Sequence, residues 1–390
     1  MKILYISTRI PFPTTSGDRM IIYNRLIRTY KKHEISLIAF YQNDDDLKGL
    51  KHLEFFFEKI WTIKVTKFDG LVNLASNFFI SQDPLQVMYY NSNSTRKKVQ
   101  SIIGSNKFDL INAYLIRVTP FIKGVKIPIV LDMIDSMQLN FLNRIKNANN
   151  FLKYFFYKYE YNRLVKFELS LSGFDRAIFV SKRDGKMVPF KSSIIPLGVD
   201  TEIFKPAKNN SKKIIFSGNM SYEPNIQAIT WFIENCWDSI VCSVSGVQLI
   251  IAGMSPTPEI KKLESDNVVV TGYVDSMAEL ISKSSVAITP MVSGSGMQTK
   301  LLEAMSCEIP IVSTSYGVGD VKARHMKEIL ISNSALDFSN YVIDVLLNPE
   351  KYDQIAVNGR RFVVENYSWD SHIESLMQVY NSILKKKGEI

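Results

Sequence analysis

Two charged residues follow a run of small residues in a pattern that suits a phosphorylated ligand. The loop Ser293 to Gly296 precedes a predicted helix whose residues include Lys300 and Glu303. Small residues let a ligand approach the backbone closely, and the free N–H groups of a helix start favour an anion. Lys300 adds a full charge about one turn in. Glu303, one turn later on the same side, would accept hydrogen bonds from sugar or ribose hydroxyls. The alternative is an ordinary strand–turn–helix connection with an exposed Lys–Glu pair.

A second set of polar residues follows two predicted strands in the first half of the chain. Asp132 and Asp135 come at the end of the strand Ile129 to Met133, where catalytic or sugar-binding groups are commonly found. The alternative for either aspartate is capping of the next helix. Three further candidates on the same row of loops come from the neighbouring strand: Asn112, Tyr114 and Arg117.

These candidates require two sheets of parallel strands to position them. Short apolar runs alternate with helical segments, which predicts an α/β fold with a helix-covered parallel sheet in each half. The loop from Pro11 to Asp18 follows the first strand but lacks GxGxxG, so an ordinary dinucleotide site is not predicted. Hydrophobicity drops at about 200–212, where we place the domain boundary. The predicted strands are 3–7, 35–40, 61–65, 110–113, 129–133, 177–180, 193–196, 214–217, 247–252, 268–271, 286–289 and 309–313.

Composition describes an ordinary globular protein with a preference for anionic partners. The chain has 390 residues, 46% apolar residues and a formal net charge of +9. The three cysteines have no metal-ligand spacing, which fits a reducing cytoplasm. No signal peptide or membrane span is predicted. The acidic run Asp44 to Asp46 is interpreted as a solvated loop, because no other carboxylate or histidine cluster supports a metal site.

The segment Phe151 to Leu171 is a predicted helix dense in aromatic residues with interleaved Lys and Arg. A basic amphipathic helix can lie on an anionic membrane surface. We favour packing of its aromatic residues against the sheet, because apolar residues occur on several faces. Base stacking with RNA is a third alternative, but no RNA-recognition motif accompanies the helix.

Several motifs in order along the chain resemble family 4 glycosyltransferases of the GT-B fold. They include LGVDTEIFKP from Leu197, FSGNMSYEPN from Phe216, TGYVD from Thr271 and GSGMQTKLLEAM from Gly294, followed by NGRRFVVENYSWDSH. The resemblance covers nearly the whole chain and is strongest from Ile194 to Thr314. The FSGNMSYEPN and GSGMQTKLLEAM stretches in particular resemble those of bacterial transferases of surface-polysaccharide assembly.

The resemblance implies two Rossmann-like, doubly wound domains that face a cleft, with a C-terminal helix crossing back to the first domain. Residues 1–203 would bind the acceptor, 204–370 would bind the nucleotide sugar, and 371–390 would form the returning helix. Glu303 matches the second Glu of the family's EX7E motif and would bind ribose hydroxyls. The implied donor-binding set is Gly17, Arg19, Gly218, Asn219, Gly272, Tyr273, Val274, Ser295, Gly296, Met297, Gln298 and Thr299.

The chain departs from the family pattern at three places. Ser295 stands where EX7E has its first Glu, which normally contacts the donor sugar. The loop GNMSYEPN lacks the usual Arg and Lys, so Lys300, helped by Arg19, would supply positive charge to the pyrophosphate. None of the four histidines lies at a matching strand end, so Asp135 or Asp132 is the substitute candidate. The predicted catalytic residues are therefore Asp135, Lys300 and Glu303.

The resulting hypothesis is a retaining hexosyltransferase-like enzyme that uses a UDP- or GDP-type sugar and needs neither metal nor cofactor. Its acceptor would be a glycan or lipid-linked glycan of capsule, O-antigen or exopolysaccharide synthesis. A cytoplasmic location is expected, with peripheral contact to the inner membrane surface left open and nucleic acid not expected as a partner. Two alternatives are a nucleotide-sugar epimerase on the same fold and a degenerate transferase that binds a partner without catalysis.

Overall fold

The computed structural model describes residues 1–14, 17–148, 150–207, 211–293 and 297–388. The chain divides into unit 1, Met1–Pro196 with Ile373–Ile390, and unit 2, Leu197–His372. The first division comes before the 203/204 boundary expected from the sequence, because the start of LGVDTEIFKP is bound into unit 2. The Val199 N–H donates to the Tyr367 carbonyl at 2.7 Å, and the Trp369 N–H donates to the Val199 carbonyl at 3.2 Å.

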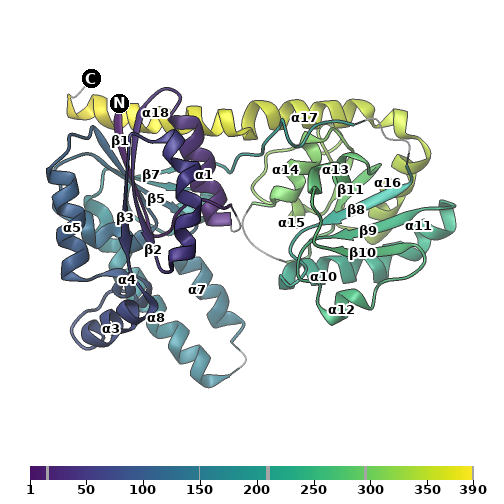
Figure 1. Cartoon of the computed structure of the whole chain (residues 1–390). Coiled ribbons are helices and arrows are strands. Elements are labelled where there is room, and N and C mark those ends of the chain that lie inside the picture. Colours follow the sequence, from purple (N-terminus) through teal and green to yellow (C-terminus); the bar gives the residue numbers. More distant parts are fainter. Residues whose placement is uncertain (15–16, 149, 208–210, 294–296, 389–390) are drawn as a thin grey trace. The chain divides into compact units, whose positions relative to one another are not determined.

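Among the described residues of unit 1, seven parallel strands form one sheet in the order β3-β2-β1-β4-β5-β6-β7 (Figure 1). Side chains alternate between the two faces of a strand, so Leu4 and Ile6 enter one buried cluster together with residues of α5 (Asn93–Gly104) and α8 (Phe151–Leu169). The strands are β1 (Lys2–Ser7), β2 (Glu34–Tyr41), β3 (Lys59–Lys64), β4 (Leu110–Tyr114), β5 (Ile129–Ile134), β6 (Arg176–Phe179) and β7 (Ser192–Ile194).

Helices connect these strands. Helix α1 begins directly at Gly17 and covers the sheet with Ile22 and Leu26, which are buried. The helices of unit 1 are α1 (Gly17–Thr29), α2 (Leu50–Leu53), α3 (Lys67–Asn77), α4 (Leu85–Tyr90), α5 (Asn93–Gly104), α6 (Thr119–Ile122), α7 (Met137–Lys146), α8 (Phe151–Leu169) and α9 (Lys182–Gly185).

The favoured interpretation of the aromatic helix is wrong for its first half. In α8, Leu164 and the aliphatic part of Arg163 are buried, and Tyr157 packs on α7 against Phe141. The side chains of Phe151 and Phe155, in contrast, are exposed. Packing therefore uses the C-terminal half of α8, and most aromatic rings of the N-terminal half have no sheet to cover.

Unit 2 repeats the same architecture. Its described residues include six parallel strands in the order β10-β9-β8-β11-β12-β13. Ile214 and Phe216 face one core and Ile215 faces the other, so helices bury both faces of the sheet. The two-residue strand β13 was not predicted. The strands are β8 (Lys213–Ser217), β9 (Gln248–Ala252), β10 (Val268–Gly272), β11 (Val286–Thr289), β12 (Ile311–Ser313) and β13 (Leu330–Ile331).

The helices of unit 2 are interleaved with these strands. The first of them continues through a π-helical turn, Ile233–Trp237, into the next. Their bounds are α10 (Glu223–Phe232), α11 (Asp238–Ser243), α12 (Pro258–Lys261), α13 (Met277–Ser282), α14 (Thr299–Ser306), α15 (Ser315–Val318), α16 (Ala335–Leu347) and α17 (Asp353–Tyr367).

Both sheets have the strand order of a doubly wound Rossmann-like domain, which confirms the predicted α/β fold with a parallel, helix-covered sheet in each half. In each sheet the order reverses beside the first strand, between β1 and β4 and between β8 and β11. Ligands of such sheets bind at the carboxyl ends of the strands at this point. The loops that follow β1, β4, β8 and β11 are therefore the first place to look for a site.

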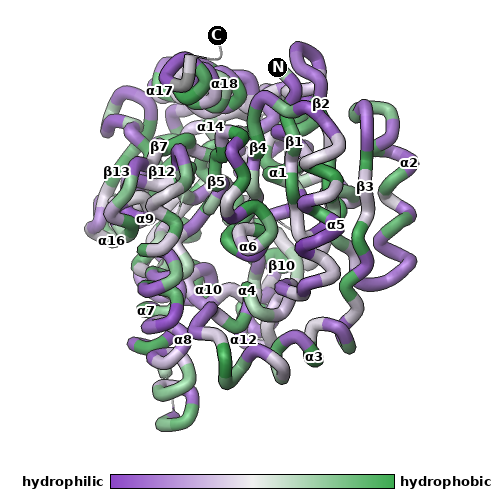
Figure 2. Tube along the Cα trace, turned by 90° about the vertical axis from the view of Figure 1, so that its left-hand side faces the viewer, coloured by the Kyte–Doolittle hydropathy of each residue, from purple (hydrophilic) through white to green (hydrophobic). Residues whose placement is uncertain are grey.

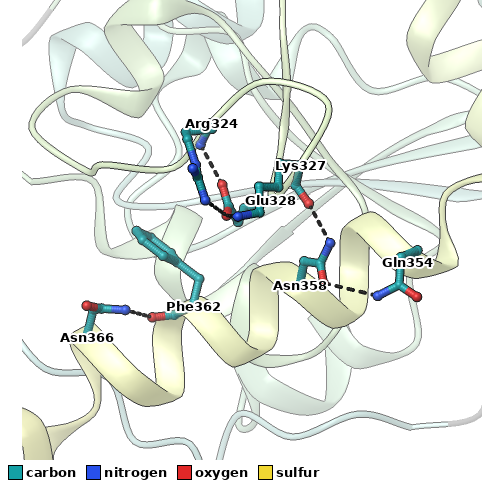
Figure 3. A network of polar contacts seen from close by, with 7 residues as sticks. All are labelled: Arg324, Lys327, Glu328, Gln354, Asn358, Phe362 and Asn366. Atoms are coloured by element: carbon teal, nitrogen blue, oxygen red, sulfur yellow. Dashed lines mark hydrogen bonds and ion pairs between the residues drawn. The ribbon is translucent and has the colours of Figure 1, made fainter.

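Helix α17 fixes the position of α14, the helix that carries Lys300 and Glu303. A Cβ atom on Gly359 of α17 would lie 3.6 Å from Cγ of Met305 in α14 and 3.0 Å from the Glu328 carbonyl oxygen, so the helix packs closely on both. Arg360 donates to the Ser306 carbonyl at the end of α14, where a cation is favoured. Asn358 donates to the Lys327 carbonyl at 3.1 Å, which ties α17 to the loop before β13 (Figure 3).

The last helix, α18 (Trp369–Lys387), begins in unit 2 and continues into unit 1 from Ile373. Its Tyr380 is fully buried in unit 1. The Tyr380 hydroxyl lies 3.0 Å from the Tyr5 hydroxyl and accepts from the Asn112 side chain at 2.5 Å. The polar group of a deeply buried tyrosine thus has partners on β1 and β4, which fixes the helix against the sheet.

Candidate functional site

Three adjacent strands of unit 2 end in glycines, and their backbones form a floor without side chains. Gly218 follows β8, Gly253 follows β9, and Gly272 ends β10. Gly218 N–H donates to the Ala252 carbonyl at 2.9 Å, and Gly253 N–H donates to the Gly272 carbonyl at 3.1 Å. A Cβ on Gly253 would lie 1.6 Å from the Gly218 carbonyl oxygen, and its φ is +145°. Only glycine fits there, and a ligand can approach the backbone closely.

Lys300 lies beside this floor. Its side chain is 8% exposed, and Nζ donates to Asn225 Oδ1 at 2.6 Å. Nζ also lies 3.9 Å from the Met291 sulfur and 4.4 Å from the centroid of the Phe216 ring. Within the described part of the chain Lys300 forms no salt bridge. The ammonium is thus held by an amide, a thioether and a ring, none of which neutralises its charge.

Burial shifts the pKa values of Lys300 and Glu303 in opposite directions, and each shift favours the uncharged form. Desolvation lowers the pKa of Lys300 to about 7, and Glu303 opposes that shift. Desolvation also raises the pKa of Glu303 to about 7, and Lys300 opposes that shift. Burial penalises the charged form of each group, so both titrate near neutral pH and each stabilises the other's charge. A diphosphate bound here would add further negative charge beside Lys300 and favour its ammonium form.

Helix α14 begins at Thr299, so Lys300 is in its first turn rather than one turn in as predicted. The predicted donor residues Gly218 and Asn219 lie next to Lys300 through Asn225, whose Nδ2 donates to the Asn219 carbonyl at 2.8 Å. Unit 2 also contains other predicted donor residues. Met297, Gln298 and Thr299, at the start of α14, are half-buried. After β10 the Tyr273 ring is 70% exposed, and the next residue, Val274, is half-buried. Ser295 and Gly296 lie outside the described residues.

Two predicted donor residues belong to unit 1. Gly17 begins α1, and a Cβ added to it would meet no atom within 4 Å. Arg19 pairs with Asp46 at 3.2 Å. Asp46 partly compensates the charge of Arg19, and the role of Arg19 in supplying positive charge to the pyrophosphate stays a prediction.

Asp135 is the exposed carboxylate at the end of β5. The N-cap of α7 is Ser136, whose hydroxyl accepts from the Leu139 N–H at 3.3 Å, so Asp135 is not the cap. Although the residue reaches solvent, protein atoms surround much of its carboxyl group, and this desolvation, together with the nearby carboxylate of Asp184, raises the pKa of Asp135 to about 6. Asp184 is itself fixed, because it accepts from the Ser136 N–H at 2.8 Å. A carboxylate whose pKa is raised toward neutrality is suited to accept a proton.

The backbone is strained where the candidate residues of unit 1 leave the sheet. Ile134, directly before Asp135, has φ +62°, and Leu115, directly after β4, has φ +67°. A positive φ in a β-branched or bulky residue costs on the order of 1–3 kcal/mol. The pairing of β5 with β6 also shifts register between Asp132 and Ile134. These features turn Asp135 out of the sheet.

Other acceptor-side predictions need correction because the residues are buried and paired. Asp132 and Arg25 are both fully buried and form an ion pair. Asn112 is fully buried and donates to Tyr380. Tyr114 is 2% exposed and donates to the Asp18 carbonyl at 2.7 Å. Their side chains hold the sheet edge together and do not line an open site.

Arg117 remains half-buried and donates to Gln86 at 3.1 Å. The sequence analysis missed Asn225, which orients Lys300 from the first turn of α10. Its place at the end of the loop GNMSYEPN was a signal, but an asparagine there is also an ordinary turn residue.

Two searches of the described residues gave negative results. They contain no group of three or more His, Cys, Asp or Glu side chains arranged to hold a metal ion. Across the same residues, every helix is too short or too polar to cross a bilayer.

Residues 211–348 match the family model of group 1 glycosyl transferases. This segment contains the glycine floor, Lys300 and Glu303. Over 99% of both chains, the sequence is 25% identical to an uncharacterised 44.6 kDa protein in the cps region of Klebsiella pneumoniae.

Solved structures are similar over nearly the whole chain. Sucrose-phosphate synthase from Thermosynechococcus elongatus has a TM-score of 0.68 at 13% identity, over 99% of this chain and 100% of that one. HepE of Anabaena in complex with UDP-glucose has a TM-score of 0.63 at 13% identity, over 98% and 100%.

Proposed function

Because the chain is a glycosyltransferase of the GT-B fold, we propose that it transfers a sugar from a nucleoside diphosphate to a glycan or lipid-linked glycan with retention of anomeric configuration. The proposed product belongs to cell-surface polysaccharide, which the similarity to a cps-region protein supports. The proposal uses no cofactor or metal besides the nucleotide sugar. The resemblance to GT-B glycosyltransferases stated from the motifs is thereby confirmed, and the details of the reaction are the proposal.

The observation that carries the donor site is a buried ammonium beside a floor of backbone. Departure of a nucleoside diphosphate concentrates negative charge on the pyrophosphate while the sugar becomes oxocarbenium-like. Lys300, held 2.6 Å from Asn225, is oriented before the ligand arrives, so little reorganisation accompanies the reaction. The pyrophosphate would lie against Gly218 and the first turn of α14. Glu303 would accept from ribose hydroxyls.

Asp135 is the proposed acceptor-side group. In a retaining transfer on one face of the sugar, the leaving phosphate can take the acceptor proton, so a strong base is not essential. A carboxylate with a pKa of about 6 is mostly ionised at pH 7. It would orient the acceptor hydroxyl and stabilise the developing cation.

A UDP- or GDP-type sugar is the proposed donor. HepE, which has a similar structure, binds UDP-glucose. The proposed contacts to the base are backbone groups near Gly272 to Val274, where the Gly272 φ is +65° and a Cβ would meet no atom within 4 Å. The sugar itself depends on side chains that include Ser295, where the family normally has Glu.

The test is turnover of the purified chain with a panel of UDP- and GDP-sugars and an extract of glycans and lipid-linked glycans. Released nucleoside diphosphate is followed with and without extract, and the anomeric configuration of the new linkage is read by NMR. We expect release with one donor that depends on the extract, and a linkage with the configuration of the donor.

Three results would contradict the proposal. An inverted linkage would remove the retaining mechanism. Isomerisation of a nucleotide sugar without acceptor would identify an epimerase. Saturable binding of a nucleotide sugar with no turnover on any acceptor fraction would identify a non-catalytic protein.

A further inference from the structure

Unit 1 exposes large apolar side chains on two elements that are not adjacent in the sequence. One is α3 with the residues that follow it, where Phe79 is 93% exposed. The other is the N-terminal half of α8, where Leu152 is 80% exposed. We call the α3/α8 patch the surface formed by Phe68, Phe79, Ile80, Phe151, Leu152 and Phe155, all of which are exposed. Isolated exposed apolar residues are ordinary, but a concentration of this kind marks an interaction surface.

Direct contacts join the two elements into one surface. The rings of Phe78 and Tyr159 lie 6.5 Å apart between centroids. The Arg163 guanidinium lies 5.6 Å from the Phe78 ring and 4.9 Å from the Tyr159 ring, and it donates to the Ser81 carbonyl at 2.5 Å. Figure 1 shows α3 and α8 at the same end of unit 1, and Figure 2 shows hydrophobic stretches along both. The patch is therefore an ordered part of the fold.

The charges that α8 exposes are of one sign, whereas α3 exposes both Lys67 and Asp69 beside Phe68. The charged side chains that α8 exposes are Lys153, Lys158 and Lys166. Its two acidic residues are turned inward, where Glu160 accepts from the Leu85 N–H and Glu168 accepts from the Gln138 side chain, each at 2.7 Å. The preceding helix α7 contains Arg144 and Lys146 and no acidic residue.

The arrangement of apolar residues on α8 favours insertion of its end. Phe151 and Phe155 contact each other at 4.2 Å between ring centroids, and Leu152 and Phe156 extend the apolar surface around the helix. Because apolar residues lie on several sides of its first turns, the N-terminal end of α8 can insert into the boundary between headgroups and acyl chains. The long side chains of its exposed lysines can then reach the headgroups. One apolar face alone would instead indicate a helix lying flat against a partner.

We propose that the α3/α8 patch binds the surface of an anionic lipid bilayer. Aromatic and aliphatic side chains enter the boundary between headgroups and acyl chains, and the lysines of α8 contact anionic headgroups. A bilayer satisfies both features together, because each lysine near an anionic surface contributes about 1 kcal/mol and each buried apolar group adds to it. A second copy of this chain would bring the same positive charges together, which disfavours self-association through the patch.

The experiment is flotation of the purified full-length chain with vesicles of phosphatidylcholine alone and of phosphatidylcholine mixed with phosphatidylglycerol. Two variants test the two parts of the surface: F155S/F156S removes exposed rings, and K153E/K158E reverses exposed charges. Their controls are F55S, at a ring that is 90% exposed elsewhere in unit 1, and K31E/K32E, at two exposed lysines after α1. Thermal unfolding checks that each variant is folded, which exposed positions should permit.

We expect binding to the phosphatidylglycerol vesicles that weakens with added salt. F155S/F156S should lose most of it, and K153E/K158E should weaken it on the order of 25-fold or more, at about fivefold for each lysine charge removed. The two controls should bind like the parent chain. Equal loss in the controls, equal binding to both kinds of vesicle or no binding at low salt would each overturn the proposal. So would a dimer that F155S/F156S dissociates, because it would identify the patch as a contact between copies.

Discussion

The carboxyl edges of the two sheets have the same topology and opposite chemistry. In unit 2 the edge consists of glycine backbone with one buried cation beside it. In unit 1 the edge is filled by side chains that already have partners, as in the ion pair of Asp132 with Arg25. Strand order alone predicts a ligand site at both edges. Side chains make the difference: the edge in unit 2 lets a ligand approach the backbone closely, whereas the edge in unit 1 presents the carboxylate of Asp135.

The two edges also store free energy in different ways. In unit 2, desolvation lowers the pKa of the buried Lys300, and a bound anion would favour its charged form again. Unit 1 keeps a strained backbone at Ile134 and Leu115, which presents Asp135 at a fixed angle. We therefore expect a substitution in unit 1 to change either the stability, as at Asp132, or the turnover, as at Asp135. Substitutions near Lys300 should mainly change ligand binding and turnover.

The largest expected effect is on the stability of unit 1. Asp132→Asn leaves the fully buried Arg25 guanidinium without a counter-charge, which typically costs about 3–5 kcal/mol of unfolding free energy. Denaturant unfolding of the variant measures the loss. Asp175→Asn, at a carboxylate on the opposite end of the sheet that accepts from the Ile129 N–H, is the control and should cost less. If Asp132→Asn is as stable as the parent, Asp132 is not the structural partner that the geometry indicates.

Lys300→Met should reduce turnover roughly 10²- to 10³-fold, the usual effect of removing one donor to a developing anion. Methionine keeps the length of the buried stem, and removal of a desolvated charge should leave the folded state at least as stable. The measurement is the rate of nucleoside diphosphate release together with the melting temperature. Lys283→Met, at an exposed lysine paired with Glu279, is the control. Retained turnover in Lys300→Met would remove the phosphate role.

Asp135→Asn should lower turnover about 10- to 100-fold, because it removes an orienting charge and leaves the leaving phosphate to act alone. In the parent chain, activity should rise with pH through about 6, since Asp135 must lose its proton to act. The variant should lack that limb of the pH–rate profile. Stability should change little, in contrast to Asp132→Asn. A limb near pH 6 that survives in the variant would assign it to another group.

The fold was predictable because its determinants are local. Buried parallel strands are short apolar runs, and their alternation with helices defines both sheets. Lys300 and Glu303 were predictable for the same reason, since three residues of helix place both on one side. The two-residue strand β13 was missed because Leu330 and Ile331 are too few to form a pattern.

The features that could not be predicted from the sequence depend on tertiary contacts. Asp132 and Asp135 look alike as acidic residues at a strand end. The register shift of β5 and the positive φ of Ile134 expose one, while Arg25, far away in the sequence, buries the other. The exposure of Phe151 and Phe155 was misjudged because aromatic content cannot say where the sheet stops. Asn225 was missed because only packing brings its amide to Lys300.

A smaller effect is expected at the glycine floor. A Cβ on Gly218 would lie 2.7 Å from Asn225 Nδ2 and 3.2 Å from Lys300 Nζ, at φ +152°. Gly218→Ala should therefore displace the side chains of Asn225 and Lys300. UDP binding should weaken about tenfold, which corresponds to roughly 1.4 kcal/mol of binding free energy. Gly246→Ala is the matched control, because its φ is +73° but its Cβ would meet no atom within 4 Å. Calorimetric titration should show unchanged UDP binding in that control. Equal weakening in both variants would point to backbone strain alone.

The smallest effect is a fraction of a proton, and it tests the electrostatics of unit 2 directly. At pH 8 Lys300, with a pKa of about 7, is mostly neutral in the free protein. A bound diphosphate favours the ammonium and raises this pKa, so UDP binding should take up a proton from the buffer. UDP itself is fully ionised at pH 8, since the second pKa of a terminal phosphate is about 6. Titrations in two buffers of different ionisation enthalpy give the number of protons.

The uptake should approach but not reach one proton per UDP in the parent chain and should fall in Lys300→Met, where Glu303, with a pKa of about 7 in the parent, is the member of the pair that still titrates. Glu303→Gln separates the two partners, because Glu303 already favours the charged form of Lys300. Without that carboxylate the free lysine should be still more neutral, and the uptake at pH 8 should increase. No uptake in the parent chain would mean that the diphosphate binds away from Lys300. The contrast between the two edges would then rest on the glycine floor alone. Without the cation, that backbone surface would not favour a diphosphate over an uncharged ligand.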